Sequence, residues 1–197
     1  MSAINGDISF SGNDLSVIKL GGSLLETESL RACLEVVSRW PGRVAIVTGG
    51  GVFADQVRIQ QQCWHFDDVA AHRMALLAMQ QMALLCQSLM PAFSLFDSVA
   101  AFDDVKRVGI WMPDVLELDA AAIPNAWQVT SDSLAAWLAG CLAADRLVLV
   151  KAASVDEGAA LPSLQARGVV DDAFLHFAEP ERYRISVISQ PHFLVMP

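Results

Sequence analysis

The stretch Val17-Ile18-Lys19-Leu20-Gly21-Gly22-Ser23 sets the fold class of this chain. Its apolar, partly β-branched beginning is typical of a short buried strand, and Gly-Gly-Ser is typical of a tight turn ahead of a helix. Glycines let backbone N–H groups approach an oxyanion, a helix N-terminus adds a positive dipole, and Lys19 adds a point charge. The stretch therefore predicts an anion-binding turn, with a tight turn beside a solvated lysine as the alternative.

A second segment of the same kind follows. Arg43-Val44-Ala45-Ile46-Val47-Thr48 has the pattern of a buried strand and ends in Gly49-Gly50-Gly51, after which a helical pattern begins. Two such turns on neighbouring parallel strands lie side by side at the carboxyl edge of a sheet, where open α/β folds bind their ligands. The two glycine turns therefore predict one shared binding site.

Predicted strands and helices alternate along the whole chain. The connection at residues 113–118 is predicted to be either a helix or a loop. The order predicts a three-layer α/β/α sandwich with a largely parallel central sheet, formed by a single domain over residues 1–197. Apolar patterns and their Gly and Pro boundaries predict strands at 17–20, 43–48, 93–96, 108–111, 146–150 and 183–189, and helices at 28–40, 52–62, 67–90, 132–142 and 171–177.

The predicted helix at 67–90 is apolar around most of its circumference, which is typical of a helix buried on nearly all sides. A chain of 197 residues has little room to enclose so long a helix. The helix is therefore either a core helix or the contact surface of a homodimer or higher homo-oligomer.

Composition and charge exclude several kinds of partner. The chain is 54% hydrophobic, yet no uninterrupted apolar run reaches the roughly 18 residues of a membrane span, so no membrane is expected. The net charge of -9 and the lack of a basic patch argue against nucleic-acid binding. The N-terminus lacks the pattern of an export signal, so a cytoplasmic location is expected.

The four cysteines predict neither a metal centre nor disulfide bonds. Cys33, Cys63, Cys86 and Cys141 lie far apart without a Cys-x-x-Cys spacing, each in an apolar helical context. Four reduced core thiols are therefore expected. No cluster of Asp, Glu, His or Cys has the spacing of a metal cage, so no protein-bound metal is predicted.

Two further segments complete a recognisable order. Thr130-Ser131-Asp132-Ser133 opens a helix, and the strand at 146–150 runs into Lys151, with Val155-Asp156 behind it. Together with the glycine turns, these segments resemble the amino acid kinase family, which includes uridylate, acetylglutamate and isopentenyl phosphate kinases. The resemblance implies a carbamate kinase-like fold and ATP-dependent phosphoryl transfer. It places the acceptor on roughly residues 14–125 and the nucleotide on roughly 126–197.

The resemblance also implies roles for individual residues. Phosphoryl transfer depends on positioning and on charge stabilisation, which Lys19 and Lys151 would supply while Asp132 holds both. Solvated lysines at strand ends and a simple helix N-cap are the alternatives. ATP, with Mg²⁺ carried by its phosphates, is expected to contact Lys19, Gly21, Gly22, Ser23, Thr130, Ser131, Lys151 and Asp156. The acceptor, a small molecule that bears a phosphate, is expected to contact Gly49, Gly50, Gly51, Asp55 and Arg58.

In this arrangement the planar guanidinium of Arg58 would bind the acceptor phosphate, and Asp55 would face the acceptor beside it. A local ion pair between these two residues, at positions i and i+3, is the alternative. His72, on the long helix near the same edge, is expected to be a satisfied, partly buried histidine rather than a catalyst.

Segments 52–58, 71–79 and 127–139 look like the compact branch of the family that contains the archaeal [5-(aminomethyl)furan-3-yl]methyl phosphate kinase. This likeness implies phosphorylation of a phosphate monoester during synthesis of a methanofuran-like cofactor. A kinase similar to isopentenyl phosphate or uridylate kinase is one alternative. A non-catalytic binding protein with the same fold is another, because the family's adenine-side loop does not follow Asp156.

Overall fold

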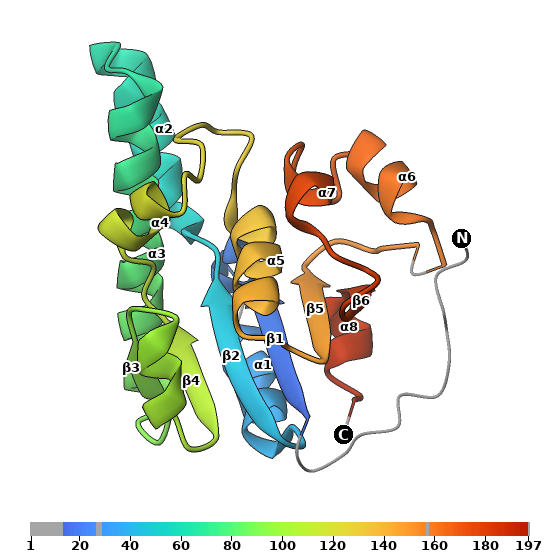
Figure 1. Ribbon diagram of the computed structural model, residues 1–197. Coiled ribbons are helices and arrows are strands. Elements are labelled where there is room, and N and C mark those ends of the chain that lie inside the picture. Colours follow the sequence, from blue (N-terminus) through green and yellow to red (C-terminus); the bar gives the residue numbers. More distant parts are fainter. Residues whose placement is uncertain (1–13, 27–28, 157, 197) are drawn as a thin grey trace.

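A parallel sheet forms the centre of the molecule. The computed structural model describes residues 14–26, 29–156 and 158–196. Within these ranges the strands are β1 (Leu15–Leu20), β2 (Arg43–Thr48), β3 (Ser94–Phe96), β4 (Val108–Trp111), β5 (Arg146–Lys151) and β6 (Arg184–Ser189). They form one sheet with the order β3-β4-β2-β1-β5-β6, in which every neighbouring pair is parallel (Figure 1).

Helices cover both faces of this sheet, which confirms the predicted three-layer sandwich. The helical elements are η1 (Gly22–Glu26), α1 (Ser29–Arg39), α2 (Gly51–Trp64), α3 (Asp68–Leu89), η2 (Ala100–Asp104), α4 (Val115–Ala120), α5 (Ser131–Cys141), α6 (Leu161–Ala166), α7 (Phe174–Phe177) and α8 (Gln190–Phe193). In Figure 1, α5 lies in front of the sheet, and α1 and α8 lie behind it. α2 and the beginning of α3 pack together beyond the carboxyl ends of the central strands (Figure 1).

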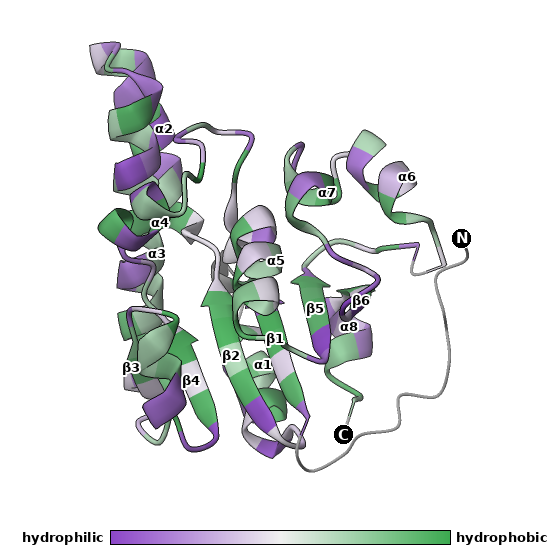
Figure 2. Ribbon diagram, viewed as in Figure 1, coloured by the Kyte–Doolittle hydropathy of each residue, from purple (hydrophilic) through white to green (hydrophobic). Residues whose placement is uncertain are grey.

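The alternation of side chains along the strands divides the core into two halves. Successive strand residues point to opposite faces, and the central strands are apolar along most of their length (Figure 2). One core cluster includes Val17 and Leu149 and packs under α5. The other includes Ile18 and Val150 and packs under α1. Lys19 follows Val17 by two residues, and Lys151 follows Leu149 by two residues. Both lysine side chains therefore point to the face that carries α5.

The chain crosses the sheet between β4 and β5. Strands β2, β4 and β3 lie on one side of β1, whereas β5 and β6 lie on the other. Ligands of open α/β proteins bind outside the carboxyl ends of the strands at such a switch point. Lys19 near the end of β1 and Lys151 at the end of β5 lie there, on adjacent strands.

Helix α3 is only partly buried, which corrects the prediction of burial on nearly all sides. Its outer face exposes Met74 (39%), Leu77 (50%), Leu84 (50%) and Leu85 (37%). By length and composition, α3 is the one helix of the described chain that is apolar enough to cross a membrane, and 44% of that apolar window is buried. A core helix of a soluble protein meets the same criteria.

Two other predictions are corrected by where the helices lie. Cys33 and Cys86 are buried, and burial raises the pKa of their thiols to about 11 and about 12. Cys63, near the end of α2, and Cys141, the last residue of α5, are exposed, so they are not core thiols. The helix predicted at 171–177 is limited to α7, and Asp171 precedes it in a loop.

Candidate active site

The two glycine turns lie directly against each other. Gly49 N donates a hydrogen bond of 2.9 Å to the carbonyl of Leu20. A Cβ atom on Gly22 would lie 2.5 Å from the backbone nitrogen of Gly51, and one on Gly49 would lie 2.7 Å from that of Gly22. Such distances are shorter than any real Cβ contact, so only glycine allows the two backbones to meet. The turns therefore form one continuous backbone surface at the carboxyl edge of the sheet.

A cavity of about 270 Å³ opens beside this surface. Its walls come from both glycine turns, from α2 and α3, and from the segment that leads into α5. Ala75, Leu76, Met79 and Val129 contribute apolar wall. The predicted site residues that line it are Gly22, Ser23, Gly49, Gly50, Gly51, Asp55, Arg58, Thr130 and Ser131.

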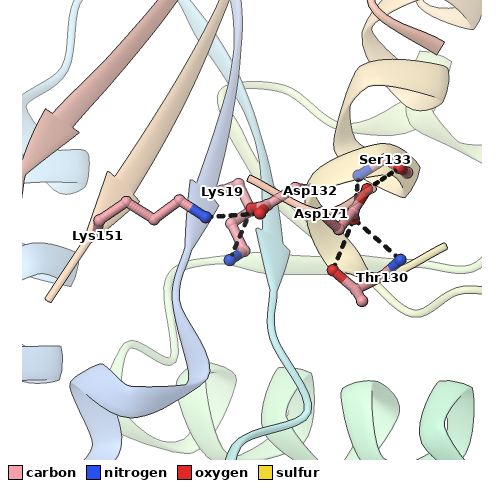
Figure 3. Close-up of polar contacts among 6 residues, drawn as sticks. All are labelled: Lys19, Thr130, Asp132, Ser133, Lys151 and Asp171. Carbon is pink, nitrogen blue, oxygen red and sulfur yellow. Dashed lines mark hydrogen bonds and ion pairs between the residues drawn. The ribbon is translucent and has the colours of Figure 1, made fainter. Parts of the chain in front are cut away.

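Next to the cavity, one carboxylate bridges two lysines from different strands (Figure 3). Lys19 Nζ lies 2.9 Å from Asp132 Oδ1, and Lys151 Nζ lies 2.6 Å from Asp132 Oδ2. Lys19 and Asp132 are buried. The predicted arrangement of these three residues is formed, because β1, β5 and the first turn of α5 converge at the switch point.

This bridge carries a net positive charge in a poorly solvated place. Burial alone raises the pKa of Asp132, but Lys19 and Lys151 outweigh burial and hold that pKa below its usual value. Burial and the neighbouring Lys19 lower the pKa of Lys151, Asp132 and Asp171 oppose both effects, and the net result is a pKa of about 8. With two ammonium groups and one carboxylate, the site is suited to a bound anion.

Helix ends strengthen this preference. α2 begins at the cavity with Gly50 as N-cap, which has no side chain to accept a hydrogen bond from the first turn. α5 also begins there, but the Asp171 carboxylate already accepts hydrogen bonds from the Thr130 and Ser133 N–H groups at this end. Helix N-termini attract anions through their N–H groups and dipoles. The cavity and the adjoining bridge therefore combine backbone donors with ammonium groups, which is the chemistry of phosphate binding.

The far end of the cavity has a different character. Arg58 forms an ion pair of 2.9 Å with Asp55, so the predicted local alternative is present. The Arg58 guanidinium carbon also lies 4.5 Å from the centre of the Trp127 ring, whose Nε1 donates to Gln61 Oε1 at 2.7 Å. Arg58 follows Gly51 by seven residues, about 10 Å along α2. It therefore lies away from the glycine turns, toward the outer end of the cavity.

The sequence predicted no role for Trp127 or Gln61, because both side chains are uncharged and their contact joins positions 66 residues apart. The position of Trp127, just ahead of Thr130-Ser131-Asp132, was the available signal. His72 also lines the cavity and is buried. Burial lowers its pKa, partly offset by the Ala126 backbone and by Asp119, so the ring is neutral near pH 7. This agrees with the prediction of a satisfied buried histidine.

Four predicted nucleotide residues do not line the cavity: Lys19 and Lys151 lie beside it in the bridge, and Gly21 and Asp156 lie elsewhere. Gly21 is buried beneath it, where a Cβ atom would lie 3.3 Å from the carbonyl of Val150. Asp156 is exposed on the loop after β5, with Arg167 Nη1 at 3.9 Å from its carboxylate. In the described residues no group of three or more His, Cys, Asp or Glu side chains could hold a metal ion.

A parallel α/β sheet whose switch point joins two glycine turns to a lysine–aspartate–lysine bridge defines a phosphate-binding protein of the phosphotransferase class. The model of the amino acid kinase family matches residues 14–155, and the chain belongs to this family.

Solved structures of this fold are similar over nearly the whole chain. Uridylate kinase from Archaeoglobus fulgidus superposes with a TM-score of 0.67 and 18% identity, covering 91% of this chain and 93% of that one. UMP kinase from Bacillus anthracis gives a TM-score of 0.65 and 15% identity, covering 90% and 88%. At these identities the likeness concerns the fold.

Among curated proteins, [5-(aminomethyl)furan-3-yl]methyl phosphate kinase from Methanocaldococcus jannaschii is 22% identical over 128 residues. The match covers 63% of this chain and 59% of the relative, so the chain spans less than two thirds of that protein's length.

Proposed function

We propose that this protein is an ATP-dependent kinase that transfers the γ-phosphoryl group to a small phosphate monoester. The observation that carries the proposal is the Lys19–Asp132–Lys151 bridge beside the two apposed glycine turns. Phosphoryl transfer requires aligned reactants and cations near the equatorial oxygens, and little covalent assistance. Lys19 and Lys151 meet that requirement, while Asp132 holds the two ammonium groups at a fixed separation.

The residues at the nucleotide end fit ATP with its magnesium ion. A glycine surface that no Cβ could occupy, the N-terminus of α2 and the net positive charge of the Lys19–Asp132–Lys151 bridge suit a polyphosphate. In this proposal Lys19, Gly22, Ser23, Thr130, Ser131 and Lys151 contact ATP, whereas Gly21 lies beneath the turn and Asp156 lies outside the cavity. Bound ATP supplies the phosphoryl group, with Mg²⁺ shielding its charge. Lys19 and Lys151 stabilise the charge that develops on transfer.

For the acceptor we propose [5-(aminomethyl)furan-3-yl]methyl phosphate, used in synthesis of a methanofuran-like cofactor. In this proposal Gly49, Gly50 and Gly51 hold the reacting phosphate, and Asp55 and Arg58 bind the outer part of the molecule. The 22% identical relative supports this choice. The cavity of about 270 Å³ has the size of a small molecule, and Asp55 could pair with an ammonium group.

One observation favours a second candidate, a binding protein without turnover. Asp156 is exposed and lies near Arg167 rather than at the cavity. A kinase whose nucleotide loop has been shortened would retain the anion site and bind ATP weakly.

The experiment that separates these functions is a panel of phosphate monoesters incubated with ATP and Mg²⁺, with products followed by ³¹P NMR. The panel contains aminomethylfuranyl methyl phosphate, isopentenyl phosphate and UMP. Diphosphate formation from aminomethylfuranyl methyl phosphate supports the full proposal. Diphosphate formation from isopentenyl phosphate or UMP instead would keep the kinase function and identify that compound as the acceptor. ATP binding by calorimetry without any turnover would support the binding protein.

We further propose that the protein acts in the cytoplasm as a homodimer or higher homo-oligomer through the outer face of α3. The exposed apolar side chains of Met74, Leu77, Leu84 and Leu85 support this assembly. An apolar face of this kind on a single helix is typical of a protein–protein contact.

A further inference from the structure

The first turn of α5 is held by a carboxylate from a distant part of the chain. Asp171 lies in the loop before α7, 38 residues along the chain from Ser133. Its Oδ2 accepts hydrogen bonds from Thr130 N at 3.0 Å, Thr130 Oγ1 at 2.7 Å and Ser133 N at 3.0 Å. Its Oδ1 accepts from Ser133 Oγ. Figure 3 shows the four bonds converging on this one side chain.

Asp171 accepts the hydrogen bond that an N-cap side chain normally accepts from the first turn of a helix. In most helices the N-cap residue itself accepts a hydrogen bond from the backbone N–H of the second or third helical residue. Here the N-cap is Thr130, which makes no such bond, and its hydroxyl donates to Asp171 instead. Ser133 is the third helical residue, and its N–H is satisfied by Asp171. A carboxylate at this end of the helix also interacts favourably with the helix dipole.

The capped turn is the one that carries Asp132. Asp132 lies between the two capped residues and is buried, with Lys19 and Lys151 on its two oxygens. Its contacts of 2.9 and 2.6 Å tolerate little movement of the helix backbone. A fraying first turn would therefore change the separation of the two lysines.

Asp171 also acts on Lys151 through its charge. The charged groups that face Lys151 are Lys19 from β1, Asp132 from α5 and Asp171 from the loop before α7. Lys19 and burial lower the pKa of Lys151, whereas Asp132 and Asp171 raise it. Asp171 thus helps to keep the Lys151 ammonium protonated.

We propose that Asp171 is a positioning residue, a carboxylate from the C-terminal segment that caps α5 and holds Asp132 against Lys19 and Lys151. Its consequence for turnover rests on the proposed kinase function, whereas its consequence for the helix does not. Asp171 lies beyond residues 14–155, which the family model matches. The site is therefore completed by a part of the chain outside that match.

The test compares Asp171→Asn and Asp171→Ala with Asp172→Asn. The control removes the same charge one residue further on, from an exposed side chain. Hydrogen exchange measured by NMR should be at least about tenfold faster at the Thr130 and Ser133 amides in both Asp171 variants, because each amide loses a charge-assisted hydrogen bond. The control should exchange like the parent protein.

A second readout follows Lys151 by ¹³Cε NMR titration, with Lys106 as an internal reference. Removal of the Asp171 charge should lower the titration midpoint of Lys151 by about half a pH unit in Asp171→Asn, and Asp172→Asn should leave it unchanged. If the Asp171 variants fail to fold, Ser133→Ala removes one of the four bonds and should speed exchange at Thr130 to a smaller extent.

The third readout is kinetic. With ATP and an accepted phosphate monoester, Asp171→Asn should lower kcat at least about tenfold while the acceptor KM changes less than about twofold. Amide exchange and Lys151 titration equal to those of Asp172→Asn would overturn the proposal. If the parent protein phosphorylates no acceptor, the kinase function fails, and the first two readouts still decide the role of Asp171.

Discussion

The Lys151 ammonium lies 2.6 Å from one oxygen of Asp132, and Lys19 pairs with the other oxygen of the same carboxylate. One buried acid therefore sets the separation of two cations that come from adjacent strands. Because a carboxylate flanked by two ammonium groups stays ionised, the three-residue bridge itself carries one positive charge in excess, which favours a nearby anion.

Replacing Lys19 or Lys151 with Ala should lower kcat by about two orders of magnitude or more, because preorganised charge is lost at the reacting phosphate. The fold should survive, since the other lysine still pairs with Asp132. The measurement is steady-state kinetics together with circular dichroism. Lys106→Ala, at an exposed position on the opposite edge of the sheet, is the control. Near-normal turnover in both site variants would remove these lysines from the mechanism.

Activity should decline as the pH rises through about 8, because burial lowers the pKa of Lys151 to about 8 and its neutral amine cannot stabilise phosphate charge. The measurement is kcat against pH at saturating substrates. The Lys151→Arg variant stays charged in this pH range, so its kcat should not decline as the pH rises through about 8. Between about 8 and 10.5 the unfolded chain binds more protons at this residue, so the contribution of Lys151 to the free energy of unfolding rises with pH there.

Replacing Gly22 with Ala should lower the free energy of unfolding by about 1–3 kcal/mol, because the added Cβ would overlap the backbone of Gly51. Separation of the two turns should also weaken ATP binding. Thermal unfolding and calorimetry measure the two effects. Gly158→Ala is the control, since its Cβ atom would meet only Asp156, at an ordinary 3.8 Å. Equal stability of the two variants would contradict the close contact of the turns.

Replacing Arg58 with Lys should raise the acceptor KM at least about tenfold, since Lys lacks the planar fork and the flat face that meets Trp127. The Kd for ATP should change little. Asp55→Asn should weaken an acceptor that bears an ammonium group and leave isopentenyl phosphate nearly unaffected. Arg31→Lys, on the exposed side of α1, is the control. An effect of Arg58→Lys on ATP binding alone would mean that the glycine turns are assigned the wrong way round.

Light scattering should detect a mass that is a multiple of the 21.3 kDa chain, because the outer face of α3 is apolar and exposed. The double variant Leu77→Glu, Leu84→Glu should be monomeric, since burying charge in an apolar contact is costly. Leu116→Glu, an equally apolar and more exposed position on α4, should leave the mass unchanged. A parent protein of 21.3 kDa would contradict the assembly.

The fold class and the core of the site could be predicted from the sequence because both depend on local patterns. Buried strands were evident as short apolar runs, and the glycine turns followed them directly. Parallel strands joined by helices leave few topologies, which brings Lys19, Lys151 and Asp132 to one edge. The order of the glycine turns, Thr130-Ser131-Asp132 and Lys151 resembles the amino acid kinase family, and this resemblance selected one of those topologies.

Tertiary structure alone decided which distant groups meet. The sequence shows that α3 is apolar around most of its circumference, but not which part the rest of the fold covers. The outer leucines of α3 and the exposed Cys63 and Cys141 could therefore not be placed. Asp171 caps α5 across 38 residues of chain, and Arg58 contacts the Trp127 ring across 69 residues of chain. Such contacts cannot be predicted from a local sequence pattern, because a carboxylate or a ring binds whichever donor or cation the completed fold brings to it.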